Sequence, residues 1–204
     1  MEEIVFNILL LGDSNVGKTS LIIRFIKDKF EENNSSTVGL EFADKEIKIN
    51  DNIIRLHILD TAGQEKYKSI AKSAIKRANG IIFVFDLNSE ESFDNIKYWL
   101  MSSLEVSNDF NKILVGNKYD LRREVDKDKV QKLIEKYNFK YFETSAKDGK
   151  NVQLIFKEIA GLILSGQSEK DIKEKYIKIN NQSINSQKKR IVVIKNNFKW
   201  TIKK

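Results

Sequence analysis

The octapeptide GDSNVGKT at residues 12–19 fits the pattern G-x-x-x-x-G-K-[ST] at every position. It follows an apolar run, IVFNILLL at 4–11, and opens residues 18–28, where apolar side chains recur at helical spacing. Glycines between a strand and a helix let backbone N–H groups face phosphate oxygens, and the start of the helix adds a favourable dipole. The pattern predicts a phosphate-binding loop, with Lys18 on the β- and γ-phosphates and the Thr19 hydroxyl on Mg²⁺.

Strands and helices are expected to alternate around this loop. Apolar or alternating runs predict strands at 4–11, 40–48, 53–59, 81–87, 112–117 and 139–143. Helical spacing predicts helices at 18–28, 91–107, 126–137 and 150–164, with Asp126 as an N-cap. This alternation predicts an α/β fold with a six-stranded, mostly parallel sheet, helices on both faces and a hairpin turn at 50–52. Ligands of such sheets bind beyond the carboxyl ends of the strands.

The segment DTAGQE at 60–65 follows one of these strands and contains groups suited to a triphosphate. The Asp60 carboxylate can hold Mg²⁺, directly or through its water. The backbone N–H of Gly63 can reach a γ-phosphate if the loop folds inward, and the Gln64 amide can orient an attacking water. The segment therefore predicts the hydrolytic part of the site.

Two further loops, NKYD at 117–120 and ETSAK at 143–147, contain groups suited to a purine base. The Asp120 carboxylate can accept hydrogen bonds from N1–H and the 2-amino group of guanine. Adenine would leave this carboxylate unpaired, at a cost of about 1–3 kcal/mol. Lys118 can lie along the base and tie its loop to the phosphate loop. The Ala146 N–H can reach guanine O6, and the Lys147 stem can cover the base.

The ordered motifs GDSNVGKT, DTAGQE, NKYD and ETSAK resemble the Ras superfamily of small GTPases over residues 4–165. TVGLEF at 37–42, QEKYKSI at 64–70 and IIFVFDLNSEESF at 81–93 most resemble Rab proteins. The resemblance implies a P-loop NTPase small G domain that binds GTP or GDP with Mg²⁺. It implies slow GTP hydrolysis, stimulated by an activating protein, and a molecular switch in vesicle trafficking.

The resemblance also assigns roles to individual residues. It makes Thr37 a Mg²⁺ ligand when the γ-phosphate is present, stacks Phe30 on the guanine and makes Gln64 the catalytic glutamine. The expected nucleotide contacts are Asp13, Ser14, Asn15, Val16, Gly17, Lys18, Thr19, Ser20, Phe30, Thr37, Gly63, Asn117, Lys118, Asp120, Ser145, Ala146 and Lys147. The expected Mg²⁺ ligands are Thr19, Thr37 and Asp60, and the expected catalytic residues are Gln64 and Lys18.

Charge is concentrated at the C-terminal end of the sequence. The formal net charge is +7, and residues 166–204 hold eleven Lys or Arg against three acidic residues. We therefore expect a G domain at 1–165 and a basic, flexible tail at 166–204. The tail is either solvated or in weak contact with an anionic membrane, since apolar side chains interleave its basic ones after residue 188. Nucleic acid is not expected as a partner, because the remaining residues are nearly neutral.

Several classes of protein are excluded or disfavoured by composition. The sequence has no cysteine, which excludes disulfides, thiolate metal sites and cysteine-linked lipids within it, and it has one histidine. We expect a cytoplasmic monomer, with a peripheral position on an intracellular membrane as the further expectation. Its protein partners would be effectors, exchange factors and GTPase-activating proteins that contact residues 30–42 and 61–73. The alternatives are a nucleotide-bound interaction module with little or no hydrolysis, and a nucleotide kinase, which would need a lid.

Overall fold

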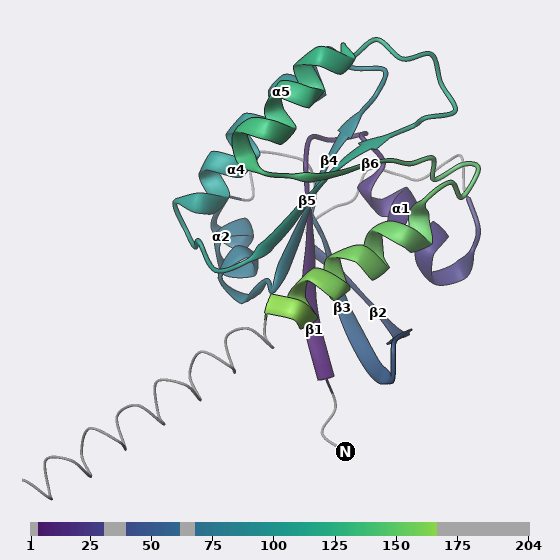
Figure 1. The fold of residues 1–204 in the computed structure, drawn as a ribbon, viewed down its shortest axis with the longest axis vertical. Coiled ribbons are helices and arrows are strands. Elements are labelled where there is room, and N and C mark those ends of the chain that lie inside the picture. The colour runs from purple at the N-terminus through teal and green to yellow at the C-terminus, as the bar shows by residue number, and fades with distance from the viewer. Residues whose placement is uncertain (1–3, 31–39, 62–67, 167–204) are drawn as a thin grey trace, which may run out of the picture. The chain divides into compact units, whose positions relative to one another are not determined.

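The computed structural model describes residues 4–30, 40–61 and 68–166 of the 204-residue chain. The chain divides into two compact units, Met1–Ile163 and Leu164–Lys204, and most of the second lies outside the described residues. The first unit contains a sheet in the order β2-β3-β1-β4-β5-β6 (Figure 1). The prediction of a six-stranded α/β sheet is confirmed.

The strands agree with the predicted runs to within about two residues. Their bounds are β1 Ile4–Leu11, β2 Leu40–Ile49, β3 Asn52–Thr61, β4 Gly80–Asp86, β5 Asn111–Asn117 and β6 Lys140–Glu143. β1 runs parallel to β3 and β4, and β5 runs parallel to β4 and β6. Among these six strands of the described residues, only β2 is antiparallel, joined to β3 through the hairpin turn in which Asn50 has a φ of 53°. The five parallel strands therefore place their carboxyl ends at one edge of the sheet.

The helices differ from the prediction in two places. Their bounds are α1 Lys18–Lys27, α2 Lys68–Arg77, α3 Glu90–Asp94, α4 Ile96–Leu104 and α5 Lys127–Tyr137, followed by a helix at 152–166. The single helix expected at 91–107 is wrong, because the chain forms α3 and α4 on either side of Asn95. The helix α2 was not predicted. The predicted N-cap is confirmed, since the Asp126 side chain accepts a hydrogen bond from the Asp128 N–H at 2.7 Å.

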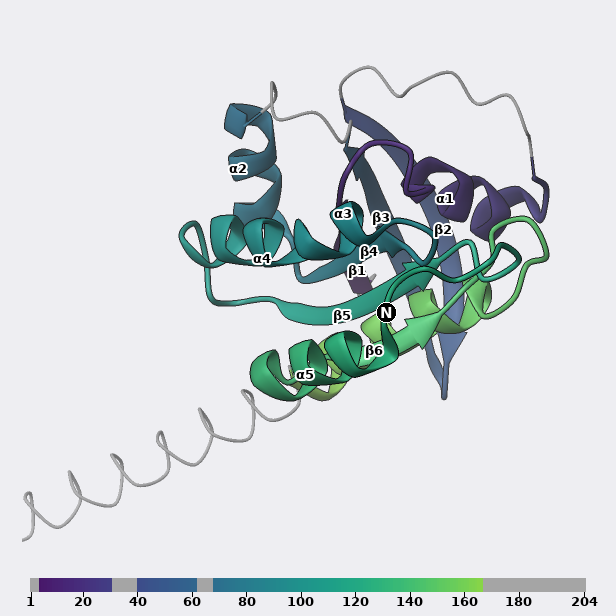
Figure 2. The same cartoon turned by 90° about the horizontal axis from the view of Figure 1, so that it is seen from above.

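Helices cover both faces of the sheet, as expected. Buried residues of α2, α3, α4 and α5 form one cluster with β4 and β5, around Phe83 and Phe85. On the other face, Phe25 of α1 stacks on Phe156 of the helix at 152–166, with ring centroids 4.0 Å apart. Figure 2 shows α2 and α1 on opposite sides of the sheet. None of the helices in the described ranges is both long and apolar enough to cross a membrane.

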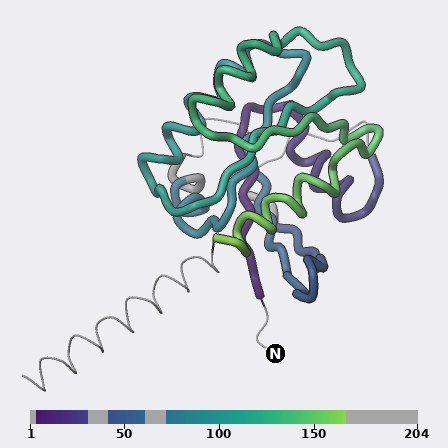
Figure 3. The backbone as a smooth tube through the Cα atoms, in the orientation of Figure 1, coloured from purple at the N-terminus to yellow at the C-terminus, as the bar shows by residue number. Residues whose placement is uncertain are grey.

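The position of β1 explains where a ligand can bind. The chain leaves β1 into α1 on one face, whereas the helices after β3 and β4 cover the other face. Figure 3 traces this path from β1, drawn in purple at the middle of the sheet. Adjacent strands whose connections leave to opposite faces create a crevice at their carboxyl ends. Residues 12–19 lie at that crevice.

Candidate functional site

The phosphate loop is wrapped around the Lys18 side chain. The Lys18 ammonium donates hydrogen bonds to the carbonyls of Gly12 at 2.9 Å and of Asp13 at 2.6 Å. Lys18 is the first residue of α1 and is only 5% exposed. The first turn of α1 holds no acidic side chain. A buried cation and an uncompensated helix start therefore meet at this point, and both favour an anion.

Both glycines of the loop lie so close to neighbouring residues that there is no room for a side chain. A Cβ at Gly12 would lie 2.0 Å from the carbonyl oxygen of Val84 in β4. A Cβ at Gly17 would lie 2.4 Å from the Asn117 amide nitrogen, and Gly17 has a φ of 92°, which disfavours any other residue. The loop is therefore pressed against β4 and against the end of β5, which gives these glycines a packing role besides the one expected from their motif.

The Asp13 side chain is directed to α4. Its two carboxylate oxygens accept hydrogen bonds from the Asn95 amide at 2.8 Å and from the Trp99 indole N–H at 2.8 Å. Its backbone carbonyl accepts from Lys18. Two donors thus stabilise a negative charge in a loop suited to anions, and they hold the main chain at Asp13 from the α4 side.

The two expected Mg²⁺ ligands in the described residues lie together. The Thr19 hydroxyl donates to Oδ2 of Asp60 at 2.5 Å, and Asp60 is buried at the end of β3. A hydroxyl and a carboxylate are hard oxygen donors of the kind that Mg²⁺ prefers. Mg²⁺ commonly completes its shell with waters and substrate phosphate oxygens, so this donor set fits it.

Burial changes the ionisation of Lys18. Desolvation lowers the pKa of its ammonium group from 10.5 to about 8, although the charges of Asp60 and Asp13 act in the opposite direction. The ammonium group is protonated at neutral pH, but its positive charge is less stabilised in this buried position than it would be in water. The negative charge of a bound polyphosphate would stabilise it.

Asn117 connects the phosphate loop to the two predicted base loops. Its amide nitrogen donates to the Val16 carbonyl at 2.9 Å, and its amide oxygen accepts from the Thr144 hydroxyl at 3.0 Å. Lys118, expected to make the tie to the phosphate loop, instead forms an ion pair with Asp86 of β4 at 2.7 Å. Asn117 therefore holds together loops that follow β1, β5 and β6.

The carboxylate expected to select the base is oriented by a serine. The Ser145 hydroxyl donates to Oδ1 of Asp120 at 2.7 Å and accepts from the Asp148 N–H at 3.0 Å. Ser145 is fully buried, whereas Asp120 is exposed. Because the buried Ser145 hydroxyl holds one oxygen of the exposed Asp120 carboxylate, the other oxygen of that carboxylate has a defined direction. A group that is to recognise a base needs such a fixed direction.

A half-buried network of side chains supports the same loops. Glu143 accepts hydrogen bonds from Nη1 of Arg123 at 2.6 Å and from the Tyr141 hydroxyl at 3.0 Å. Burial raises the pKa of the Tyr141 hydroxyl, and the nearby Glu143 charge raises it further. Tyr141 therefore remains a proton donor, which fixes the end of β6 where the segment 143–147 begins.

The described residues bring most of the predicted contacts to one edge of the sheet. The buried residues among them include Val16, Lys18, Asn117, Ser145 and Ala146. The half-buried ones include Gly17, Thr19, Ser20, Phe30 and Lys118, and the exposed ones are Ser14, Asn15, Asp120 and Lys147. Asn15 has a φ of 62°, in the left-handed region that asparagine tolerates. The predictions for Thr37, Gly63 and Gln64 fall outside the described residues.

Sequence reasoning missed several groups that the structure places at the site. Asp86 pairs with Lys118, Thr144 with Asn117, and Asn95 with Asp13. Asp86 had a usable signal, because it is an acidic residue at the carboxyl end of a strand, as Asp60 is near the end of β3. Nothing in the local sequence around Asn95 or Thr144 indicates a contact with a loop far away in the chain.

Comparison with known proteins places these features in one family. A family model described as the Ras family matches residues 7–165. Ras-related protein Rab-13 of Bos taurus is 42% identical over 163 residues, covering 78% of this chain and 80% of that protein. RABE1e of Arabidopsis thaliana is 40% identical over 190 residues, covering 90% and 87% of the two chains. Rab-8B of Homo sapiens is 40% identical over 171 residues, covering 82% and 83%.

Proposed function

The chain belongs to the Ras family of small GTPases and is Rab-like, and on that premise we propose that it binds GTP and GDP with Mg²⁺ and hydrolyses GTP to GDP. The observation that carries the proposal is the double role of Asn117, which is bonded to Val16 in the phosphate loop and to Thr144 beside the base loop. This double role supports a phosphate site and a guanine site that meet at one edge of the sheet.

The chain's own residues supply the charge that a triphosphate needs. Lys18, already held by the carbonyls of Gly12 and Asp13, binds the β- and γ-phosphates, and the start of α1 adds its dipole. Thr19 and Asp60 would hold Mg²⁺. When bound, Mg²⁺ neutralises the charge that develops on the phosphate oxygens.

Hydrolysis needs a positioned water, which we assign to Gln64. Its amide orients the water for in-line attack on the γ-phosphorus, while Lys18 stabilises the negative charge on the γ-phosphate oxygens and the β–γ bridge. The sequence has no arginine at residues 30–39, so we expect slow intrinsic turnover. A partner that supplies an arginine would accelerate it by roughly 10³–10⁵.

The output of the reaction is a conformational switch with a role in vesicle trafficking. Thr37 and Gly63 contact the γ-phosphate and order residues 30–42 and 61–73, which hydrolysis then releases. Effectors, exchange factors and GTPase-activating proteins bind through these residues. Phe42 supports such a surface, because this large apolar side chain is 73% exposed on β2. We propose that the protein acts on the cytosolic face of an intracellular membrane.

Nucleotide content and single-turnover hydrolysis test the proposal. The full chain purified with Mg²⁺ is expected to carry GDP or GTP, identified by chromatography after denaturation, and to convert preloaded GTP to GDP and phosphate. A protein that stays empty and ignores added guanine nucleotides would remove the proposal. A protein that binds GTP but never hydrolyses it would favour an interaction module instead.

Gln64→Leu is expected to bind GTP normally and to hydrolyse it at least about tenfold more slowly, because leucine cannot orient the water. Single-turnover phosphate release from GTP-loaded protein measures the effect, and Gln131→Leu, on the exposed face of α5, is the matched control. Equal rates in Gln64→Leu and the parent would exclude Gln64 from the mechanism.

The basic tail offers a second contact, with anionic lipid. Residues 188–204 hold seven basic residues and no acidic one, interleaved with apolar side chains. Deleting them is expected to abolish binding to phosphatidylserine vesicles while leaving GDP binding intact, since charge near the surface contributes about 1 kcal/mol per residue. Cosedimentation at low and high salt measures this. If the full chain does not sediment with the vesicles, the tail is simply solvated.

A further inference from the structure

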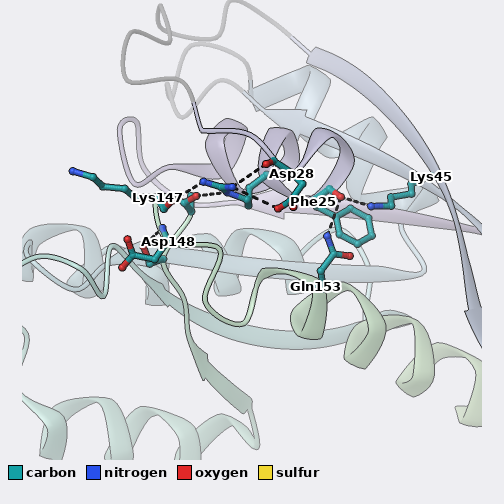
Figure 4. Close-up of polar contacts among 9 residues, drawn as sticks. Phe25, Asp28, Lys45, Lys147, Asp148 and Gln153 are labelled. Carbon is teal, nitrogen blue, oxygen red and sulfur yellow. Dashed lines mark hydrogen bonds and ion pairs between the residues drawn. The ribbon is translucent and has the colours of Figure 1, made fainter.

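One side chain of α1, Arg24, holds the loop expected to read the base. Its Nε donates to the Ala146 carbonyl at 2.8 Å, and its Nη2 donates to the Lys147 carbonyl at 2.5 Å. Its Nη1 donates to the Asp28 carbonyl at 3.0 Å, just past the end of α1. The Arg24 side chain is only 16% exposed. Figure 4 labels two of the residues whose carbonyls accept these bonds, Asp28 and Lys147.

The geometry of this contact restrains the backbone at Ala146. The Ala146 and Lys147 carbonyls are the first two backbone carbonyls after the Ala146 N–H along the chain. The Arg24 guanidinium alone holds both of them. The loop turns back at Gly149, which has a φ of 80° and whose Cβ position lies 3.8 Å from Cδ of Arg24. The Arg24 stem therefore packs along the turn while its planar head holds the backbone.

The same loop orients Asp120. Ser145 comes directly before Ala146 and donates its hydroxyl to the Asp120 carboxylate. A shift of the backbone at 145–147 would move this hydroxyl and release the carboxylate. Arg24 thus acts on both groups expected to contact guanine, the Ala146 N–H and the Asp120 carboxylate, without being one of the expected contacts itself.

We propose that Arg24 is a positioning residue for base recognition, which locks the loop at 145–148 onto α1. The inference rests on the proposed function, because it concerns the guanine site of that function. α1 starts at Lys18 on the phosphates and reaches the base loop through Arg24 in its last turn. One short helix therefore sets the distance between the phosphate-binding and base-binding halves of the site.

The end of α1 also provides a matched control. Lys45 of β2 and Gln153 of the helix at 152–166 both donate to the Phe25 carbonyl (Figure 4). The bond from Gln153 is 3.1 Å long. Gln153→Ala removes a hydrogen bond from the same end of α1 but none from the loop at 145–148. If the Arg24 substitutions acted only by loosening α1, Gln153→Ala would show the same change in nucleotide binding. If they act on the position of the base loop, Gln153→Ala will not show it.

The test compares GDP with inosine diphosphate, which lacks the 2-amino group that Asp120 is proposed to bind. Dissociation constants are measured for the full chain by calorimetry, in Arg24→Gln, Arg24→Lys and Gln153→Ala. Arg24→Gln is expected to weaken GDP binding about tenfold and to reduce the preference for GDP over inosine diphosphate at least about threefold. Gln153→Ala should keep the parental preference.

Arg24→Lys is expected to behave as Arg24→Gln does, because an ammonium group lacks the planar fork with which the guanidinium reaches the Ala146, Lys147 and Asp28 carbonyls together. If Arg24→Gln does not unfold cooperatively on heating, Arg24→Lys carries the test. An unchanged preference in the folded Arg24 variants would overturn the proposal. A parent protein that binds no GDP would overturn the proposed function and the role of Arg24 with it, whereas an unchanged preference in variants of a GDP-binding parent overturns the role of Arg24 alone.

Discussion

Lys18→Met is expected to weaken GDP binding by roughly 100- to 3,000-fold, because it removes the buried charge that faces the phosphates while keeping much of the side-chain volume. Loss of one partner from a buried charge pair costs about 3–5 kcal/mol. Lys18 is 5% exposed and is wrapped by the carbonyls of Gly12 and Asp13, so water cannot replace the ammonium group. Displacement of a fluorescent GDP analogue measures the loss.

The pH dependence of the parent protein gives a sharper signature of the same side chain. In the free protein the pKa of Lys18 is lowered to about 8 by burial. Bound phosphates stabilise the charged form and raise that pKa, so binding above this pH must take up a proton. GDP affinity should therefore be level below pH 8 and fall by up to about tenfold per pH unit above it.

Comparison of the parent with Lys18→Met separates the titration of Lys18 from that of the guanine of GDP. Any ionisation of guanine is common to the parent and the variant, so the difference between their affinity profiles isolates Lys18. Lys129→Met, an exposed cation paired with Glu90, is the control for a lost surface charge. A parent profile that runs parallel to that of Lys18→Met through pH 8 would contradict a buried, titrating Lys18 at the phosphates.

The parts of the site that lie within single motifs could be predicted from sequence. The motif at 12–19 fixes a loop between β1 and α1, and this loop binds Lys18 to its own backbone over five or six residues. The strands were predictable for a similar reason, since β4 and β5 are continuous apolar runs bounded by polar residues. Local sequence is sufficient where the contacts are local.

Contacts between distant segments could not be predicted in the same way. Trp99 reaches Asp13, and Arg24 reaches Ala146, only because the sheet order brings α4 and β6 beside the loops of β1 and α1. The helix α2 escaped prediction because its sequence KSIAKSAIKR is rich in basic residues and has a thin apolar face. The break at Asn95 was missed because no Gly or Pro near it signals one, and the break is slight, since the residue keeps helical dihedral angles with φ of −72° and ψ of −13°.

Asp120→Asn is expected to change the preferred base from guanine to xanthine. The Asp120 carboxylate can accept from both N1–H and the 2-amino group of guanine, whereas an asparagine amide would place its N–H against that amino group. Xanthine carries a carbonyl at this position and can accept from the asparagine. Sites that hydrogen-bond a substrate group discriminate by roughly 10⁴–10⁵, so a change in the ratio of the two affinities of at least about 10³ is expected.

The structure indicates that Asp120→Asn can change the base preference without disturbing the surrounding loop. Asp120 is exposed, and its Oδ1 accepts from the Ser145 hydroxyl, a bond that the amide oxygen of asparagine can retain. The loop should therefore keep its form while its hydrogen-bonding code changes. Asp148→Asn removes the same charge from the neighbouring exposed carboxylate and should keep the preference for guanine. Competition between GDP and xanthosine diphosphate measures both variants, and a guanine preference in Asp120→Asn equal to that of the parent would mean that another group selects the base.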